Sequence, residues 1–81
     1  GDEELALRHL ETMIQLGVPR NLLDQAWYER GEALLALGRR EEALQAFSMV
    51  IELSATRSGQ LIERAQQRID ELRFGRFDFF R

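Results

Sequence analysis

Gly31 stands inside the segment WYERGEALLALG, whose other residues are typical of an α-helix. Glycine in a helix interior costs about 1 kcal/mol relative to alanine. A helix tolerates that cost where another backbone comes close, because ordinary side chains hold two packed helix axes about 8 to 10 Å apart. Gly31 therefore predicts a helix that packs tightly against a neighbouring helix.

Apolar residues recur at three- and four-residue steps along most of the chain, the spacing that places them on one face of a helix. No segment shows the alternation of a strand. The expected fold is therefore all-α, with short turns that place consecutive helices antiparallel. The predicted helices span roughly residues 3–16, 21–37, 40–54 and 58–73.

Polar residues and glycines mark the expected helix ends. Asp2 and Asn21 are predicted N-caps of the first two helices. Asp24, at the third position of the second helix, would interact favourably with the dipole of that helix. Gly17 and Gly38 are expected to end these two helices. In the first helix, the expected apolar positions are Leu5, Ala6, Leu10, Met13, Ile14 and Leu16.

Composition restricts the class of protein. A chain of 81 residues forms at most one small domain, here residues 1–81. Its apolar fraction of 44% is that of a globular chain, with no apolar run near the roughly eighteen residues of a membrane span. The net charge of −3 predicts no nucleic-acid surface. Without a targeting segment in this sequence we expect a cytoplasmic protein, or a periplasmic one if the sequence is a fragment.

The side chains that could carry chemistry do not form a convergent set. There is no cysteine, and His9 is the only histidine, whereas a metal site needs several ligands. The acidic pairs Glu3/Glu4, Glu41/Glu42 and Asp70/Glu71 are adjacent in sequence, so their members point about 100° apart on a helix. No glycine-rich phosphate loop is present. We therefore predict no enzyme activity, no metal and no cofactor.

Four residues resemble the tetratricopeptide repeat, a helix-turn-helix of thirty-four residues with the pattern W-x2-L-G-x2-Y, later A-x3-F, then P. Trp27, Gly31, Ala43 and Phe47 stand at the spacing of that family, and Gly38 stands at its turn. The resemblance implies that Gly31 lets the second and third helices meet closely near Ala43.

Three positions depart from the family pattern: Arg30 replaces the usual leucine, Leu34 an aromatic residue and Ala55 the closing proline. The resemblance covers one full repeat, about residues 24–57. The first helix is similar to the second helix of a preceding repeat, and the last helix to the first helix of a following repeat or a C-terminal cap. The resemblance thus implies hairpins stacked as a short α-solenoid.

The family binds partner peptides in a concave groove lined by the first helix of each repeat. By rotation from Trp27 and Gly31, the resemblance places six residues on that side: Gln25, Tyr28, Glu32, Leu35, Ile62 and Gln66. Alternatively, Tyr28 and Leu35 pack against the first or the last helix. The lysine and asparagine clamp that some relatives use for a terminal carboxylate is absent, and Glu32 would repel a carboxylate. A ligand with basic or apolar residues is therefore expected.

The C-terminal segment FGRFDFFR places Phe74, Phe77, Phe79 and Phe80 close together. They either fold back over the last hairpin or form an exposed contact patch. Gly75 is expected to prevent the last helix from continuing.

Two functions remain open. One is an adaptor or scaffold that binds a protein or peptide in its groove. The other is a structural module that forms homo-oligomers or packs within a larger protein through helix faces and the aromatic tail. Charge asymmetry could support head-to-tail contact, because residues 1–56 carry five Arg against ten acidic residues and residues 57–81 carry six Arg against four.

Overall fold

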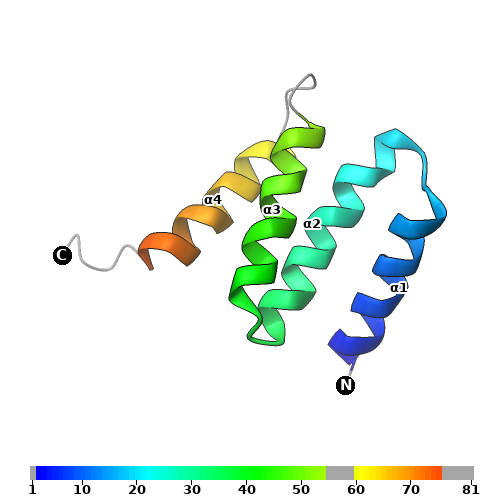
Figure 1. Ribbon diagram of the computed structural model, residues 1–81. Coiled ribbons are helices and arrows are strands. Elements are labelled where there is room, and N and C mark those ends of the chain that lie inside the picture. The colour runs from blue at the N-terminus through cyan, green and yellow to red at the C-terminus, as the bar shows by residue number, and fades with distance from the viewer. Residues whose placement is uncertain (1, 55–59, 76–81) are drawn as a thin grey trace.

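The computed structural model describes residues 2–54 and 60–75 and forms four helices there. They are α1 (Asp2–Leu16), α2 (Arg20–Ala36), α3 (Arg40–Leu53) and α4 (Gln60–Phe74). Each helix packs against the next in the chain, and α4 also touches α2 (Figure 1). The all-α prediction is confirmed, and so is the arrangement of helical hairpins. The observed bounds lie within two residues of the predicted ones.

The start of α2 differs from the prediction. The helix begins at Arg20, so Asn21 is already helical and Asp24 is its fifth residue, beyond the first turn. Pro19 occupies the N-cap with φ −54° and ψ 150°, and this residue makes no side-chain capping hydrogen bond. The fixed φ of proline directs the chain into the helix without a polar cap. Asp2, also expected as a cap, is the first residue of α1.

Gly38 ends α2 as predicted. Its φ is +79°, a left-handed conformation that glycine adopts without steric cost. The Gly38 amide donates to the Leu35 carbonyl at 3.0 Å, and the Arg39 amide donates to the Leu34 carbonyl at 2.9 Å. This pair of bonds is a Schellman motif, which satisfies the last carbonyls of α2 and turns the chain directly into α3.

The core lies between α2, α3 and α4. Its largest fully buried side chains are Phe47, Leu34 and Val50, and the small residues Ala43 and Ala65 are fully buried where helices approach. Leu7 is the α1 member of this cluster. Two helices in the middle therefore carry most of the packing, while α1 and α4 flank them.

Gly31 is buried against the ring of Phe47. A Cβ atom built at position 31 would lie 2.7 Å from Cε1 and 2.8 Å from Cζ of that ring. The predicted close approach of the second and third helices is present, but the nearest atoms belong to Phe47, one turn beyond Ala43 on α3. Because Phe47 is itself fully buried, its ring has little room to retreat.

The predicted apolar face of α1 is wrong at several positions. Leu5 and Leu16 are 66% and 81% exposed, whereas Leu7, absent from the expected set, is buried together with Leu10. Among the four described helices, α2 alone packs extensively on α1, so these helices cover one side of α1. Counting apolar residues at helical steps did not identify which side this would be.

Asp24 and Ser54 form a buried hydrogen bond between the start of α2 and the end of α3. The Ser54 hydroxyl donates to Asp24 Oδ2 at 2.7 Å, and the two residues are 7% and 3% exposed. Asp24 Oδ1 also accepts from the Gln25 amide at 2.8 Å. Asp24 thus joins two helices, a role different from the dipole interaction that its position predicted.

Replacement of Gly31 by alanine tests the contact with Phe47. Alanine adds about 1 kcal/mol of helix propensity, but its Cβ requires the Phe47 ring to move, so we expect a net loss of about 1 to 3 kcal/mol in the free energy of unfolding. Leucine should cost well over 1 kcal/mol. Urea denaturation measures both. In a Phe47→Leu background, Gly31→Ala should become neutral or stabilising; stabilisation in the native background would contradict this packing.

Ser54→Ala tests the buried link between α2 and α3. The substitution leaves Asp24 Oδ2 without its hydroxyl donor, so the free energy of unfolding should fall by about 1 to 3 kcal/mol. Ser48→Ala is the matched control, because Ser48 is exposed on the same helix. Equal stabilities of the two variants in urea denaturation would show that the bond contributes nothing.

Candidate functional site

Tyr28 and Glu32 lie one turn apart on α2 and face Arg68 of α4. Arg68 Nε donates to Glu32 Oε2 at 2.6 Å, and its Nη2 donates to Oε1 at 3.3 Å. Arg68 Nη1 also donates to Glu71 Oε1 at 3.1 Å. We call these four residues the α2–α4 cluster. It joins the first helix of the central hairpin to the helix that follows that hairpin.

The Tyr28 side chain has an apolar and a polar environment. Its ring meets the Phe47 ring edge-on, with centroids 5.5 Å apart and planes at 61°. Burial raises the pKa of Tyr28, and the negative charge of Glu32 raises this pKa further. The half-buried Tyr28 ring thus packs on Phe47 of α3, not on the first or last helix as the alternative expectation had it, while the hydroxyl belongs to the polar cluster.

One guanidinium serves two carboxylates in this cluster. The hydrogen bond to Glu32 is the main reason that the pKa of Arg68 is raised, so Arg68 stays charged at any ordinary pH. One positive charge against the two negative charges of Glu32 and Glu71 leaves a net charge of −1. The cluster is therefore acidic although each of its charges is paired.

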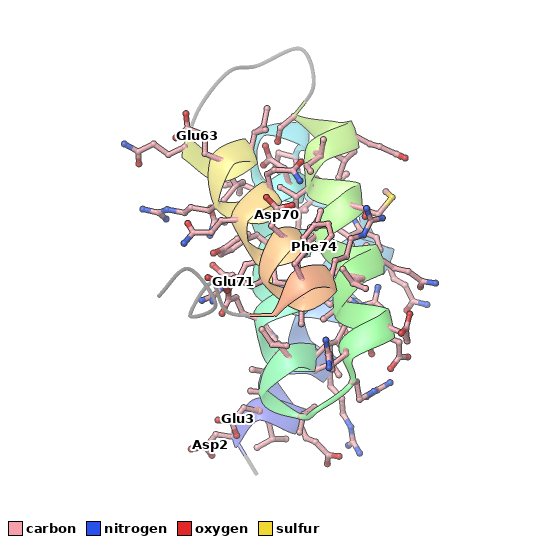
Figure 2. The ribbon with its side chains drawn as sticks, turned by 90° about the vertical axis from the view of Figure 1, so that its left-hand side faces the viewer. Asp2, Glu3, Glu63, Asp70, Glu71 and Phe74 are labelled. Carbon is pink, nitrogen blue, oxygen red and sulfur yellow. The ribbon has the colours of Figure 1, made fainter. Side chains whose placement is uncertain are left out.

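Glu32, which we expect to repel a carboxylate, is paired with Arg68 in this structure. The acidic character of this side comes instead from several residues. Glu63 and Asp70 line a shallow hollow of about 410 Å³ on α4. Figure 2 shows Glu63, Asp70 and Glu71 along this helix, with Phe74 at its end.

The described part of the chain places the six predicted groove residues in several different surroundings. Tyr28 and Glu32 meet Arg68, whereas Ile62 and Gln66 line the hollow on α4. Leu35 packs against the core and lines a separate hollow of about 410 Å³ with Leu72 and other residues. Gln25 is exposed and donates to Glu29 at 3.0 Å.

Sequence reasoning missed Arg68. It stands thirty-four residues after Leu34, so the repeat spacing alone would give it the corresponding core position. Its long side chain instead reaches from the edge of the core to Glu32 and keeps its head partly exposed. The opposite charges of Glu32 and Arg68 on helices that the repeat pattern makes neighbours were the available signal.

The C-terminal aromatic residues are described only in part. Phe74, the last residue of α4, is 66% exposed. Phe77, Phe79 and Phe80 lie outside the described residues, and so does Ala55. Gly75 follows the end of α4, in agreement with the expectation that this helix stops there.

Two further observations concern the described part of the chain. Residues 2–54 and 60–75 contain no group of three or more His, Cys, Asp or Glu side chains arranged to hold a metal ion. Within the same ranges, the length and hydropathy of every helix fall short of what crossing a bilayer requires. His9 is exposed on α1, as expected.

Comparison with protein families matches residues 24–56 to the Tetratricopeptide repeat model. This segment contains nearly all of α2 and α3, the central hairpin with the contact between Gly31 and Phe47. Searches of curated proteins and of solved structures gave no match. The matched family is typically non-catalytic.

The environment of Tyr28 predicts a measurable pH dependence. Its folded-state pKa lies above the ordinary value of 10.0, so the unfolded chain loses the phenolic proton first. The free energy of unfolding should therefore fall as pH rises above about 10, until the folded tyrosine also titrates. Tyr28→Phe should lack this part of the decline.

Absorbance measures this titration directly, because Tyr28 is the one tyrosine of the chain and there is no cysteine thiolate to absorb beside it. The tyrosinate signal should appear at higher pH in buffer than in concentrated urea. Glu32→Gln should move the folded titration to lower pH, since it removes a negative charge and leaves Arg68 nearby. Identical curves in buffer and in urea would contradict the described environment.

Proposed function

We propose that the protein is a non-catalytic adaptor or scaffold, because residues 24–56 match the tetratricopeptide repeat, in general a protein-interaction motif. Its partner is a protein that presents a peptide or helix to the side formed by α2 and α4. The single observation that carries this proposal is the surplus of carboxylates around Tyr28 and Arg68. It favours a partner segment with basic residues beside apolar ones.

The arrangement of the α2–α4 cluster supports this ligand chemistry. Glu32 and Glu71 share one arginine, so a guanidinium or ammonium group from a partner would balance the cluster charge. Such charge-assisted hydrogen bonds are stronger than neutral ones. The Tyr28 hydroxyl lies at the same cluster, and tyrosine combines contact area with a polar group, which suits interfaces.

The α4 hollow extends the same side. Ile62 offers a half-buried apolar surface, and Glu63 and Asp70 add two carboxylates beside it. A peptide that alternates arginine with an aliphatic residue would match both features. An acidic peptide would meet the like charges of Glu63 and Asp70 in this hollow and should be rejected.

A second candidate function, self-assembly or packing within a larger protein, is favoured by a different observation. Leu5 and Leu16 on α1 and Phe74 on α4 are the most exposed large apolar side chains of the described residues. They lie on the two outer helices of the arrangement, where a neighbouring copy could cover them.

Peptide titration distinguishes the ligand classes. We expect a synthetic peptide of alternating arginine and leucine to bind, and a peptide with aspartate in place of arginine not to bind. The double variant Glu63→Arg, Asp70→Arg should lower the affinity for the arginine–leucine peptide by about fivefold or more, because each reversed surface charge contributes up to about 1 kcal/mol. The double variant Glu3→Arg, Glu4→Arg on α1 is the control, because it changes the net charge by the same amount.

Equal weakening by the α1 and α4 variants would show that net charge alone attracts the peptide, which would contradict the proposed side. Sedimentation velocity over a concentration series tests the second function. If copies associate through the outer helices, Leu16→Glu and Phe74→Glu should abolish association, and a monomer at all concentrations would exclude homo-oligomers.

A further inference from the structure

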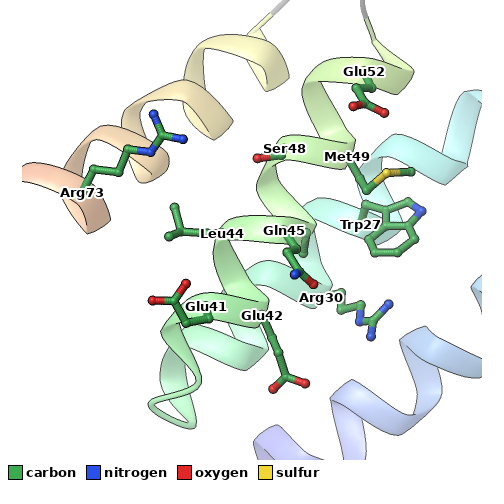
Figure 3. A pocket seen from close by; sticks show the side chains of 11 residues that line it. Trp27, Arg30, Glu41, Glu42, Leu44, Gln45, Ser48, Met49, Glu52 and Arg73 are labelled. Carbon is green, nitrogen blue, oxygen red and sulfur yellow. The ribbon is translucent and has the colours of Figure 1, made fainter.

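A valley runs between α1 and α3 on another side of α2. Its floor consists of Trp27 and Arg30, which line both neighbouring hollows, of about 570 and 540 Å³. Figure 3 shows both side chains between α3 and α1. Arg30 is two residues from Tyr28, about 200° around the helix, so the valley and the α2–α4 cluster occupy different faces of α2.

The floor of the valley is an ordered stacking surface. The Arg30 guanidinium lies over the Trp27 ring, 4.9 Å from its centroid, and Nη2 pairs with Glu11 Oε2 at 3.2 Å. Its buried Nε has no hydrogen-bond partner among the described residues. Arg30 therefore lies over the indole and is paired with Glu11 at the same time. Trp and Arg are the residue types that most often contribute the binding energy of protein interfaces.

The two walls carry opposite charges. Arg8 and Thr12 of α1 line one hollow, and Met49 and Glu52 of α3 line the other. In the described part of the chain, Glu11 is paired with Arg30, whereas Arg8 and Glu52 have no ion pair.

Glu42, also on the α3 side, is paired with Arg39. The valley thus presents the Trp27 ring and Arg30 between Arg8 on one wall and Glu52 on the other, and Glu41 and Arg73 also line the hollow on the α3 side. This pattern specifies a complementary ligand more narrowly than an apolar groove would.

We propose that this valley is a second interaction surface, which binds an amphipathic helix of a partner protein. The apolar side of that helix seats on Trp27 and Met49, an acidic residue at one edge meets Arg8, and a basic residue at the other edge meets Glu52. Helix-in-groove binding places apolar anchors and edge charges in this way. The surface does not depend on the α2–α4 cluster.

Trp27 allows a direct test, because it is the only tryptophan of the chain and lies on the valley floor. The probes are three alanine-based helical peptides with a leucine stripe. One has aspartate along one edge and arginine along the other, one has aspartate on both edges, and one has arginine on both. The mixed peptide should bind most tightly and shift the Trp27 emission to shorter wavelength.

Charge-reversed variants should change which peptide is preferred. In Arg8→Glu both walls are acidic, so the mixed peptide should lose about fivefold in affinity and the all-arginine peptide should become the best ligand. Glu52→Arg should make the all-aspartate peptide the best ligand. Arg64→Glu makes the same charge change as Arg8→Glu at an exposed position of α4, and it should leave the order of peptide affinities unchanged. Loss of folding alone would not produce these opposite changes.

Three results would overturn the proposal. The first is that the mixed peptide leaves the Trp27 emission unchanged. The second is that both charge variants keep the order of peptide affinities of the native chain. The third is that Arg64→Glu changes this order as much as Arg8→Glu does. A concentration-dependent Trp27 shift without peptide would assign the valley to a second copy of the chain instead. Because the α4 variants test the α2–α4 side separately, either proposal can fail while the other stands.

Discussion

The contact between Gly31 and the Phe47 ring determines how the rest of the molecule is arranged. Gly31 has no side chain at the point where α2 and α3 pack. The Phe47 ring occupies the space that a Cβ atom at this position would need. The same ring supports Tyr28 from another direction. A shift of Phe47 would therefore move the hydroxyl of Tyr28 relative to Glu32 and Arg68, so packing in the core and the geometry of the candidate site are coupled.

A single helix, α2, presents different chemistry on its different faces. Gly31 and Leu34 are buried in the core, Tyr28 and Glu32 meet α4, and Trp27 and Arg30 line the valley between α1 and α3. Only the core face is explained by the burial of apolar side chains that folding requires. The other two carry paired charges and partly exposed aromatic rings, and these are the features on which the two proposed surfaces rest.

The hairpin could be predicted from sequence because its determinants are local. Helical periodicity, the left-handed glycine at position 38 and the spacing from Trp27 to Phe47 each act within a few turns of helix. The cluster could be predicted only in part. Arg68 reaches Glu32 through a side-chain conformation that depends on how α4 lies, and burial of Leu7 in place of Leu5 depends on the rotation of α1. Neither long-range property is encoded in a repeat pattern.

Proton NMR tests the central contact most directly. If the Phe47 ring covers Gly31, its ring current should move the Gly31 α-proton resonances away from their ordinary positions, and both α-protons should show nuclear Overhauser effects to the Phe47 ring protons. The Phe47→Leu variant should lose the shift while remaining helical by circular dichroism. Ordinary Gly31 shifts in the native chain, with no Overhauser effect to Phe47, would contradict the packing on which the account depends.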